Sequence, residues 1–278
     1  MFKGNHAFPT AGIIINKATC IIKETNIEGF TKGGIMMWLE DEHVVKIFTT
    51  KVKNCKHAGI QIMGSSGSPL IEYCNIEDNQ GTGILVCTGN SCQIRKNEIH
   101  NNHDGVEIVS GDAILFKNNI SKNNSNGVVT RAVEDLVCAA KITLNEITSN
   151  RGHGIYCVGY NNMTKIIENK SISYNKLAGI KIDLEASCLI IKNHVFKNIH
   201  QGILVAEKSN AHIEKNEISE NIKANLAFGG EGSTNNSVMR NKIFGGRCEG
   251  IFIIEGGLSL VYKNDIYENY DGIICCTA

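Results

Sequence analysis

Hydrophobic and polar residues alternate along most of the chain, in short runs separated by glycine and asparagine. The clearest run is a glycine followed by an aliphatic residue, any residue and a second apolar residue. It begins at Gly12, Gly34, Gly59, Gly83, Gly105, Gly127, Gly154, Gly179, Gly202, Gly250 and Gly272, and Asn225 takes the place of glycine in the one gap. Successive starts are 22 to 27 residues apart. A period of two is typical of β-strands, and its regular return predicts a repeat protein.

A second unit lies between these glycine positions. Each copy of this unit reads aliphatic-x-x-Asn-x-Ile-x-x-Asn, where x is any residue. The clearest copies are residues 94–102, 142–150 and 213–221. No segment sustains the apolar spacing of three and four that helical and leucine-rich solenoids require. We therefore predict an all-β fold, a single-stranded right-handed parallel β-helix of about 11–12 coils stacked roughly 4.8 Å apart. Residues 1–278 form a single domain in this prediction.

Strand alternation assigns each repeated position to the inside or the outside of the coil. The residues directly after the glycine positions are expected inside: Ile13, Ile35, Ile60, Ile84, Val106, Val128, Ile155, Ile180, Ile203, Leu226, Ile251 and Ile273. Asparagines recur in two further columns: Asn97, Asn118, Asn145, Asn193, Asn216, Asn241 and Asn264, and Asn79, Asn102, Asn123, Asn150, Asn175, Asn198, Asn221 and Asn269. Asparagine tolerates left-handed backbone and bonds to its equivalent on the next coil, so we predict structural ladders at the turns.

The outer face of the glycine-initiated strands is unusually apolar. In the row two residues after each glycine position, nine of the twelve residues are apolar. A stripe of this size exceeds what soluble monomers usually expose, and aromatic residues and methionine are enriched in protein interfaces. We predict a partner-binding surface there, made of Met36, Trp38, Met63, Leu85, Tyr156, Val158, Phe252 and Ile254. The alternative is that turns or a terminal segment of the same chain cover this face.

Charged residues on this face do not form the carboxylate pair that many β-helix enzymes require. Lys181 and Asp183, with Glu185 beyond them, form the only charged cluster. We interpret it as a solvated cluster, with a sugar or calcium site as the alternative. Arg131 is expected two coils from Lys181, roughly 10 Å away and too far to act on the same atom. No catalytic residue is assigned, and the prediction leans away from an enzyme.

Composition excludes several classes of partner. The 28 basic and 28 acidic residues cancel, so the basic footprint of a nucleic-acid-binding protein is missing. No apolar run approaches the roughly 18 residues of a membrane span, and no secretory signal is recognised. The 11 cysteines are odd in number and scattered, which favours free thiols and a cytoplasmic location. His100 and His103 are interpreted as turn residues, and neither a metal nor a cofactor is expected.

Two segments resemble a known family. The repeats at Ala58–Val86 and Cys92–Ile108 resemble the carbohydrate-binding and sugar-hydrolase type β-helix repeats of the eukaryotic β-helical F-box-only protein and the Shc-binding spindle protein. More distantly, they are similar to periplasmic β-helix proteins of copper-enzyme maturation. The eukaryotic relatives use this fold to bind proteins, and the F-box relative presents substrates for ubiquitylation. No F-box, zinc finger or SH2-binding segment is recognisable here, and the resemblance assigns no catalytic residue.

These observations lead to one functional hypothesis and two alternatives. The hypothesis is a non-catalytic scaffold module that binds other proteins through its apolar outer face and its open β-helix ends, within an intracellular assembly of cytoskeletal or ciliary type. In this view the chain is either part of a longer one or is capped by its neighbours in the assembly. The first alternative is the substrate-recognition module of a ubiquitin-ligase adaptor. The second is a polysaccharide-binding protein, lyase or hydrolase.

Overall fold

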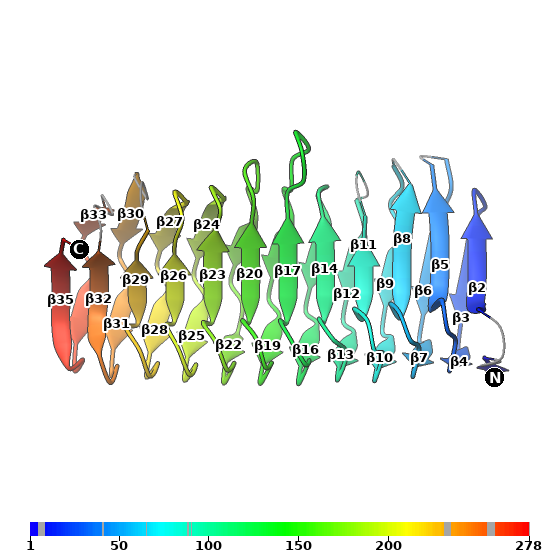
Figure 1. Cartoon of the computed structure of the whole chain (residues 1–278), viewed down its shortest axis with the longest axis horizontal. Helices are drawn as coiled ribbons and strands as arrows, with labels where there is room; N and C mark the ends of the chain where they lie inside the picture. The colour runs from blue at the N-terminus through cyan, green and yellow to red at the C-terminus, as the bar shows by residue number, and fades with distance from the viewer. Residues whose placement is uncertain are drawn as a thin grey trace.

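The computed structural model describes residues 1–4, 9–40, 42–64, 66–87, 89, 91–230, 235–254 and 259–277. In this part of the chain the strands form three parallel sheets, and there is no helix. The coils stack along one axis, so the molecule is a rod with its termini at opposite ends (Figure 1). The predicted parallel β-helix is therefore confirmed, with about 11 turns.

Each coil contributes one strand to each sheet, and the chain passes through the sheets in the order B, C, A. Sheet B contains the glycine-initiated strands: β2 (Ala11–Asn16), β5 (Gly33–Leu39), β8 (Ile60–Gly64), β11 (Ile84–Val86), β14 (Val106–Val109), β17 (Val128–Arg131), β20 (Ile155–Val158), β23 (Ile180–Asp183), β26 (Ile203–Val205), β29 (Leu226–Phe228), β32 (Glu249–Ile254) and β35 (Asp271–Cys276). Sheet C contains β3 (Cys20–Lys23), β6 (Val45–Phe48), β9 (Leu70–Glu72), β12 (Gln93–Arg95), β15 (Ile114–Phe116), β18 (Lys141–Thr143), β21 (Lys165–Ile167), β24 (Ser187–Ile191), β27 (Asn210–Glu214), β30 (Asn236–Met239) and β33 (Ser259–Tyr262). Sheet A contains β1 (Phe2–Lys3), β4 (Asn26–Glu28), β7 (Lys51–Lys53), β10 (Asn75–Glu77), β13 (Glu98–His100), β16 (Asn119–Ser121), β19 (Glu146–Thr148), β22 (Ser171–Ser173), β25 (His194–Phe196), β28 (Glu217–Ser219), β31 (Lys242–Phe244) and β34 (Asp265–Tyr267).

The pairing register confirms the predicted inward column of sheet B. Ile35 pairs with Ile13 on one side and with Ile60 on the other, and the same register continues through the sheet to Ile251 and Ile273. Most of these side chains are fully buried. Ile273, in β35, is exposed because no described coil covers it. The column packs as a continuous aliphatic core because each coil places an equivalent side chain directly above the previous one.

The second predicted unit consists of two strands joined by a bend. At residues 94–102 the chain runs along β12, bends, and continues along β13. Lys96, at the bend, has a φ of 55°, and the equivalent residues of the other coils also have positive φ. This left-handed residue rotates the chain into the next sheet, and the following asparagine fastens the corner. The turn predicted at this asparagine column therefore lies inside the repeat unit and divides the unit between sheets C and A.

Both asparagine columns form the predicted ladders. Asn145 is fully buried; its side-chain nitrogen donates to Asn169 Oδ1 at 3.1 Å, and its Oδ1 accepts from the side-chain nitrogen of Asn118 at 3.0 Å. Asn169 is a member of the first ladder that the sequence pattern left out. The second ladder has no asparagine at its usual position between Asn221 and Asn269. Asn225 replaces it: its Oδ1 accepts from the Asn221 side chain, and its side-chain nitrogen donates to Asn269 Oδ1. The ladders therefore satisfy buried polar groups along the rod.

All 11 cysteines are free thiols in the structure. Cys157 is fully buried, as expected for an inward position of sheet B, whereas Cys275 is exposed on the last strand. Among the described residues, no helix is long and apolar enough to cross a membrane.

Candidate functional site

The predicted partner surface lies on the outer face of sheet B, as the pairing register requires. Met36 and Trp38 are on β5, Met63 is on β8, Leu85 is on β11, Tyr156 and Val158 are on β20, and Phe252 and Ile254 are on β32. Their side chains are half-buried, except for Val158, which is buried. These residues do not form one continuous stripe, because charged residues on the intervening coils interrupt it. Binding of a protein partner by this surface stays a prediction.

Between these apolar residues, strands β20 and β23 carry a polar cluster that contains a buried carboxylate. Tyr156 and Lys181 are direct neighbours on β20 and β23, and Asp183 lies two residues farther along β23. The Asp183 side chain is only 8% exposed; its Oδ2 atom lies 2.7 Å from the Lys181 ammonium and accepts a 3.2 Å hydrogen bond from the Tyr156 hydroxyl. The Lys181 ammonium also lies 5.4 Å from the centre of the Tyr156 ring. The interpretation as a solvated charge cluster is therefore wrong for Asp183.

His153 joins this cluster from the turn that leads into β20. Its ring centre lies 5.5 Å from that of Tyr156, and its Nδ1 atom accepts a 3.1 Å hydrogen bond from the Ala178 backbone N–H. An acceptor at Nδ1 places the proton of the neutral ring on Nε2. Burial, reinforced by the positive charge of Lys181, lowers the pKa of His153 to about 4. At neutral pH this histidine is thus an uncharged hydrogen-bond donor.

Burial also controls the protonation of Tyr156. Together with the negative charge and the hydrogen bond of Asp183, it raises the pKa of the phenol to about 12. Tyr156 therefore holds its proton at neutral pH and directs it toward Asp183. The result is a pair of uncharged proton-bearing side chains, Tyr156 and His153, beside the cation of Lys181.

A second cation lies on the other side of Tyr156. Arg131 pairs in register with Val158, which in turn pairs with Asp183, so Arg131 is two coils from Asp183, as predicted. Its Nε lies 3.6 Å from Glu107 Oε1, and the Arg131 side chain is 44% exposed. The loop that follows β17 projects beyond its neighbours at the same edge of the sheet (Figure 1). The site thus has a buried centre and an accessible cation at its margin.

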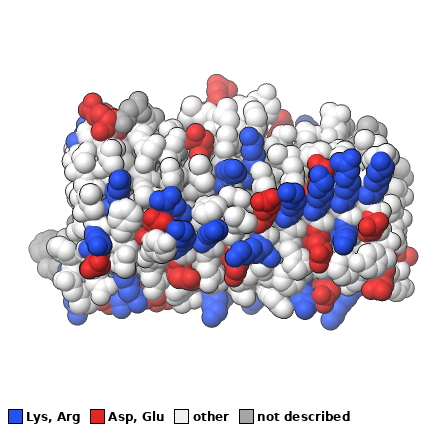
Figure 2. Space-filling view, turned by 180° about the vertical axis from the view of Figure 1, so that it is seen from behind, with Lys and Arg blue, Asp and Glu red and all other residues white. Residues whose placement is uncertain are grey.

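The rear of the rod has a different character. Figure 2 shows basic and acidic side chains interspersed over the face opposite that of Figure 1. On sheet C, Glu214 of β27 forms ion pairs with Lys215 at 3.1 Å and with Arg240 at 3.0 Å. Exposed pairs of this kind contribute little to stability. Sheet C also has a buried carboxylate, Glu72, which pairs with Arg95 and Lys96. The cluster on the outer face of sheet B differs from it by the uncharged imidazole of His153 beside the Tyr156 phenol that binds the carboxylate.

The sequence pattern placed most of this cluster correctly, but its significance was missed. The predicted outward positions already placed Tyr156 beside Lys181 on the next coil. However, only two carboxylates on adjacent coils were considered as evidence of a catalytic site. His153 was not expected in the cluster, because its distance from Tyr156 depends on how the corner folds onto the strand. The available signal was a histidine directly before the glycine position Gly154 and a tyrosine two residues after that glycine. The neighbouring strand adds the sequence Lys-x-Asp at Lys181–Asp183.

Comparisons with known proteins identify the family. The model for the right-handed β-helix region matches residues 5–121 and 178–278. The chain belongs to the right-handed β-helix family. A second model of this group, for the periplasmic copper-binding protein NosD, matches residues 83–226. No curated protein matches the chain.

Solved structures with the same fold include carbohydrate epimerases. The A-module of the mannuronan C-5 epimerase AlgE4 from Azotobacter vinelandii superposes with a TM-score of 0.60, at 14% identity over 96% of this chain and 91% of that one. The corresponding module of AlgE6 gives a TM-score of 0.54, at 12% identity over 95% of this chain and 90% of that one. The periplasmic alginate epimerase AlgG gives 0.50 at 15% identity, covering 84% of this chain and 63% of its own length. At these identities the likeness establishes the fold alone.

The described residues do not fit a copper site. The one group of three or more histidine, cysteine or acidic residues whose ligand atoms converge, in the part of the chain that the structure describes, is Glu40, Glu42 and His43. Carboxylate oxygens favour hard cations, whereas copper prefers sulfur and imidazole ligands. Glu40 is moreover engaged by Lys17 in an ion pair. We therefore derive no chemistry from a bound copper ion.

The depressed pKa of His153 predicts a pH dependence of stability. Because the pKa falls from 6.5 to about 4 on folding, its contribution is fully present above pH 6.5 and is lost as the pH falls through 4. The full loss corresponds to about 3 kcal/mol in the free energy of unfolding. Denaturant midpoints measured between pH 7 and pH 4 should fall less for His153→Gln than for the wild type. Equal pH slopes in the two proteins would contradict the burial of a neutral His153.

Proposed function

We propose that the chain binds and modifies an acidic polysaccharide on the outer face of sheet B, with the cluster of His153, Tyr156, Lys181 and Asp183 at the reacting sugar. The observation that carries the proposal is the contact of the Tyr156 hydroxyl and the Lys181 ammonium with one buried carboxylate oxygen of Asp183. A structural ion pair does not require a phenol and a neutral imidazole beside it. The combination is suited to proton transfer next to a bound anion.

The two cations account for the recognition of an acidic chain. Lys181 and Arg131 are two coils apart, with the coil of Tyr156 between them. At a separation of roughly 10 Å the two cations cannot contact the same atom, but they can contact two carboxylates of one extended polysaccharide. Lys181 neutralises the carboxylate of the sugar that lies over Tyr156, and Arg131 contacts that of another sugar along the chain.

The chemistry follows from neutralising that carboxylate. A hydrogen on the carbon next to a carboxylate becomes more acidic when a cation compensates the charge that develops as the proton leaves. The Tyr156 oxygen takes this proton as its own phenolic proton moves to Asp183, so no free phenolate is formed. The Nε2–H of His153 donates to the sugar and holds it in position. Delivery of a solvent proton to the opposite face of the carbon gives epimerisation, whereas loss of the substituent on the neighbouring carbon gives elimination.

The comparisons support this polysaccharide alternative better than the protein-scaffold hypothesis. The structural neighbours with TM-scores of 0.60 and 0.54 are named as mannuronan C-5 epimerases. A C-5 epimerase acts on the carbon that carries the uronate carboxyl group. The apolar residues farther along the same face, such as Leu85 and Phe252, then provide contact for sugar rings rather than for a folded protein.

The test is proton exchange at the carbon next to the carboxyl group. The protein is incubated with polymannuronate, polyguluronate or polygalacturonate in D₂O, and deuterium incorporation and ring configuration are followed by NMR. Exchange or inversion on one of these polymers is the expected result. Binding without exchange would reduce the proposal to a binding protein, and the absence of both binding and exchange on all three polymers would overturn it.

A further inference from the structure

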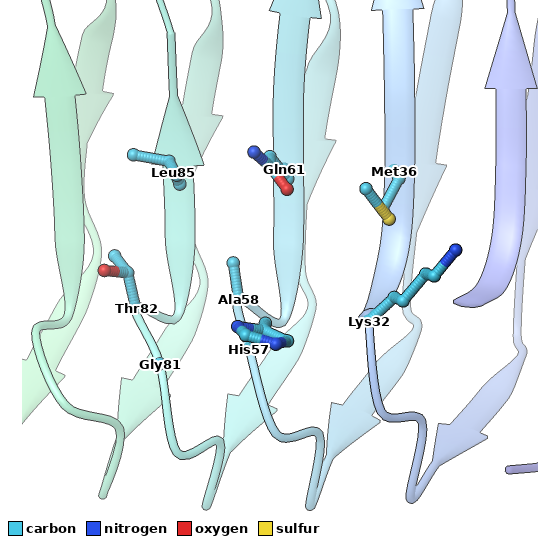
Figure 3. Close-up of a pocket in the computed structure, with 8 residues that line it drawn as sticks. All are labelled: Lys32, Met36, His57, Ala58, Gln61, Gly81, Thr82 and Leu85. Carbon is cyan, nitrogen blue, oxygen red and sulfur yellow. The ribbon is translucent and has the colours of Figure 1, made fainter. Parts of the chain in front are cut away.

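A second depression lies on the same face of sheet B, toward the N-terminal end. It has a volume of about 440 Å³ and is lined by Lys32, Met36, His57, Ala58, Gln61, Gly81, Thr82 and Leu85. Figure 3 shows Met36, Gln61 and Leu85 on three neighbouring strands, with the other lining residues on the turns below them. The depression belongs to the face of the proposed site but is separate from the cluster around Tyr156.

The lining of this depression fits one sugar ring. Met36 and Leu85 provide an apolar floor, and the amide of Gln61 between them offers a donor and an acceptor. His57 and Thr82 add polar groups at one edge. Lys32 is exposed and forms no ion pair with any described residue, so its charge is available to a ligand. An uncompensated lysine beside an apolar floor and polar side chains favours an anionic sugar.

The strand register sets the distance between this depression and the cluster. From Gln61 the outward row continues through Leu85, Glu107 and Val129 to Tyr156. This is four coil steps, or about 19 Å along the axis at roughly 4.8 Å per step. A pyranose ring with its glycosidic bond is about as long as one step. An extended polysaccharide that follows the rod therefore passes one sugar over each coil.

We propose that this depression is a distal subsite that holds one acidic sugar of a chain whose reacting sugar lies at Tyr156. The inference rests on the proposed function and adds a direction and a length to it. The polysaccharide runs parallel to the rod axis, the sugar over Gln61 is four sugars from the reacting one, and Lys32 reaches the carboxylate of that sugar from the adjoining coil of β5. Oligosaccharides shorter than about five residues reach only one of the two positions.

The test measures binding as a function of chain length. Calorimetric titrations use oligomannuronates of two to eight residues, or oligomers of whichever polyuronate the protein binds. Wild-type affinity is expected to rise by about tenfold between four and six residues, beyond the gradual trend at other lengths. Lys32→Ala is expected to remove this step and to leave the affinity for the shortest oligomers unchanged. The substitution is compatible with folding, because Lys32 is exposed and alanine keeps the backbone N–H that donates to the Thr10 carbonyl oxygen.

A matched variant separates this effect from the general loss of a positive charge. Lys242→Ala removes an exposed lysine from sheet A and should keep the length dependence of the wild type. A smooth rise in affinity with length, or a step that survives in Lys32→Ala, would overturn the distal subsite while leaving the site at Tyr156 standing. If no oligomer binds, or if Lys181→Ala binds all lengths as the wild type does, both proposals are wrong.

Discussion

Replacing Tyr156 by phenylalanine is expected to lower the rate of deuterium exchange into the bound polyuronate by about 100-fold or more, a typical loss when a proton-transferring group is removed. The substitution deletes one oxygen and keeps the ring that packs near His153. Asp183 retains Lys181 and the backbone N–H of Leu184, so the variant should fold and lose only about 1 kcal/mol of stability. Exchange is measured by NMR in D₂O at saturating polymer.

The affinity of Tyr156→Phe for the polymer is expected to change by less than about threefold, because Lys181 and Arg131 provide the charge contacts. Tyr174→Phe is the matched control, since Tyr174 is an exposed tyrosine outside sheet B. It should exchange at the wild-type rate. Full activity in Tyr156→Phe would show that another group takes the proton, and equal losses in both variants would point to a general change in the protein.

Replacing Asn145 by alanine is expected to reduce the free energy of unfolding by about 3–5 kcal/mol, because several buried groups lose their partners at once. The Asn145 side-chain nitrogen donates to the carbonyl oxygens of Leu115 and Thr143 as well as to Asn169. Its Oδ1 accepts from the backbone N–H and from the side chain of Asn118. Asn145 is fully buried, so these groups are not exposed to solvent. Chemical denaturation gives the loss as a shift of the midpoint.

Asn119 is the control for the ladder, because it is an asparagine next to the ladder residue Asn118 but at an outward position of β16. It is half-buried, and its one side-chain hydrogen bond to a residue that the structure describes is to Glu98 on the neighbouring strand. Asn119→Ala should therefore cost less than about 1 kcal/mol. Similar losses for the two variants would mean that the ladder bonds contribute no more than a surface contact.

The periodic pattern by itself determined the parallel β-helix, the stacking of its coils and the inward column. The reason is that a solenoid repeats one local conformation, so residues at equivalent positions must lie above one another once the period is known. The asparagine ladders followed for the same reason, and even Asn225 was recognised as a substitute for glycine at its position. The outward neighbours Tyr156 and Lys181 were likewise set by the register alone.

Only the tertiary structure decided which outward residues act together. The period does not say how the corner before Gly154 folds, yet this corner brings the His153 ring to the Tyr156 ring. Nor does it say that Asp183 turns back under Lys181 and Tyr156 and is buried there, because this depends on side-chain packing between adjacent coils. The asparagine columns predicted turns, but only the structure shows that the left-handed residue at the bend is Lys96 and its equivalents, each one residue before the ladder position. Repetition fixes the positions of backbones, whereas the chemistry of this face depends on the few side chains that depart from the repeat.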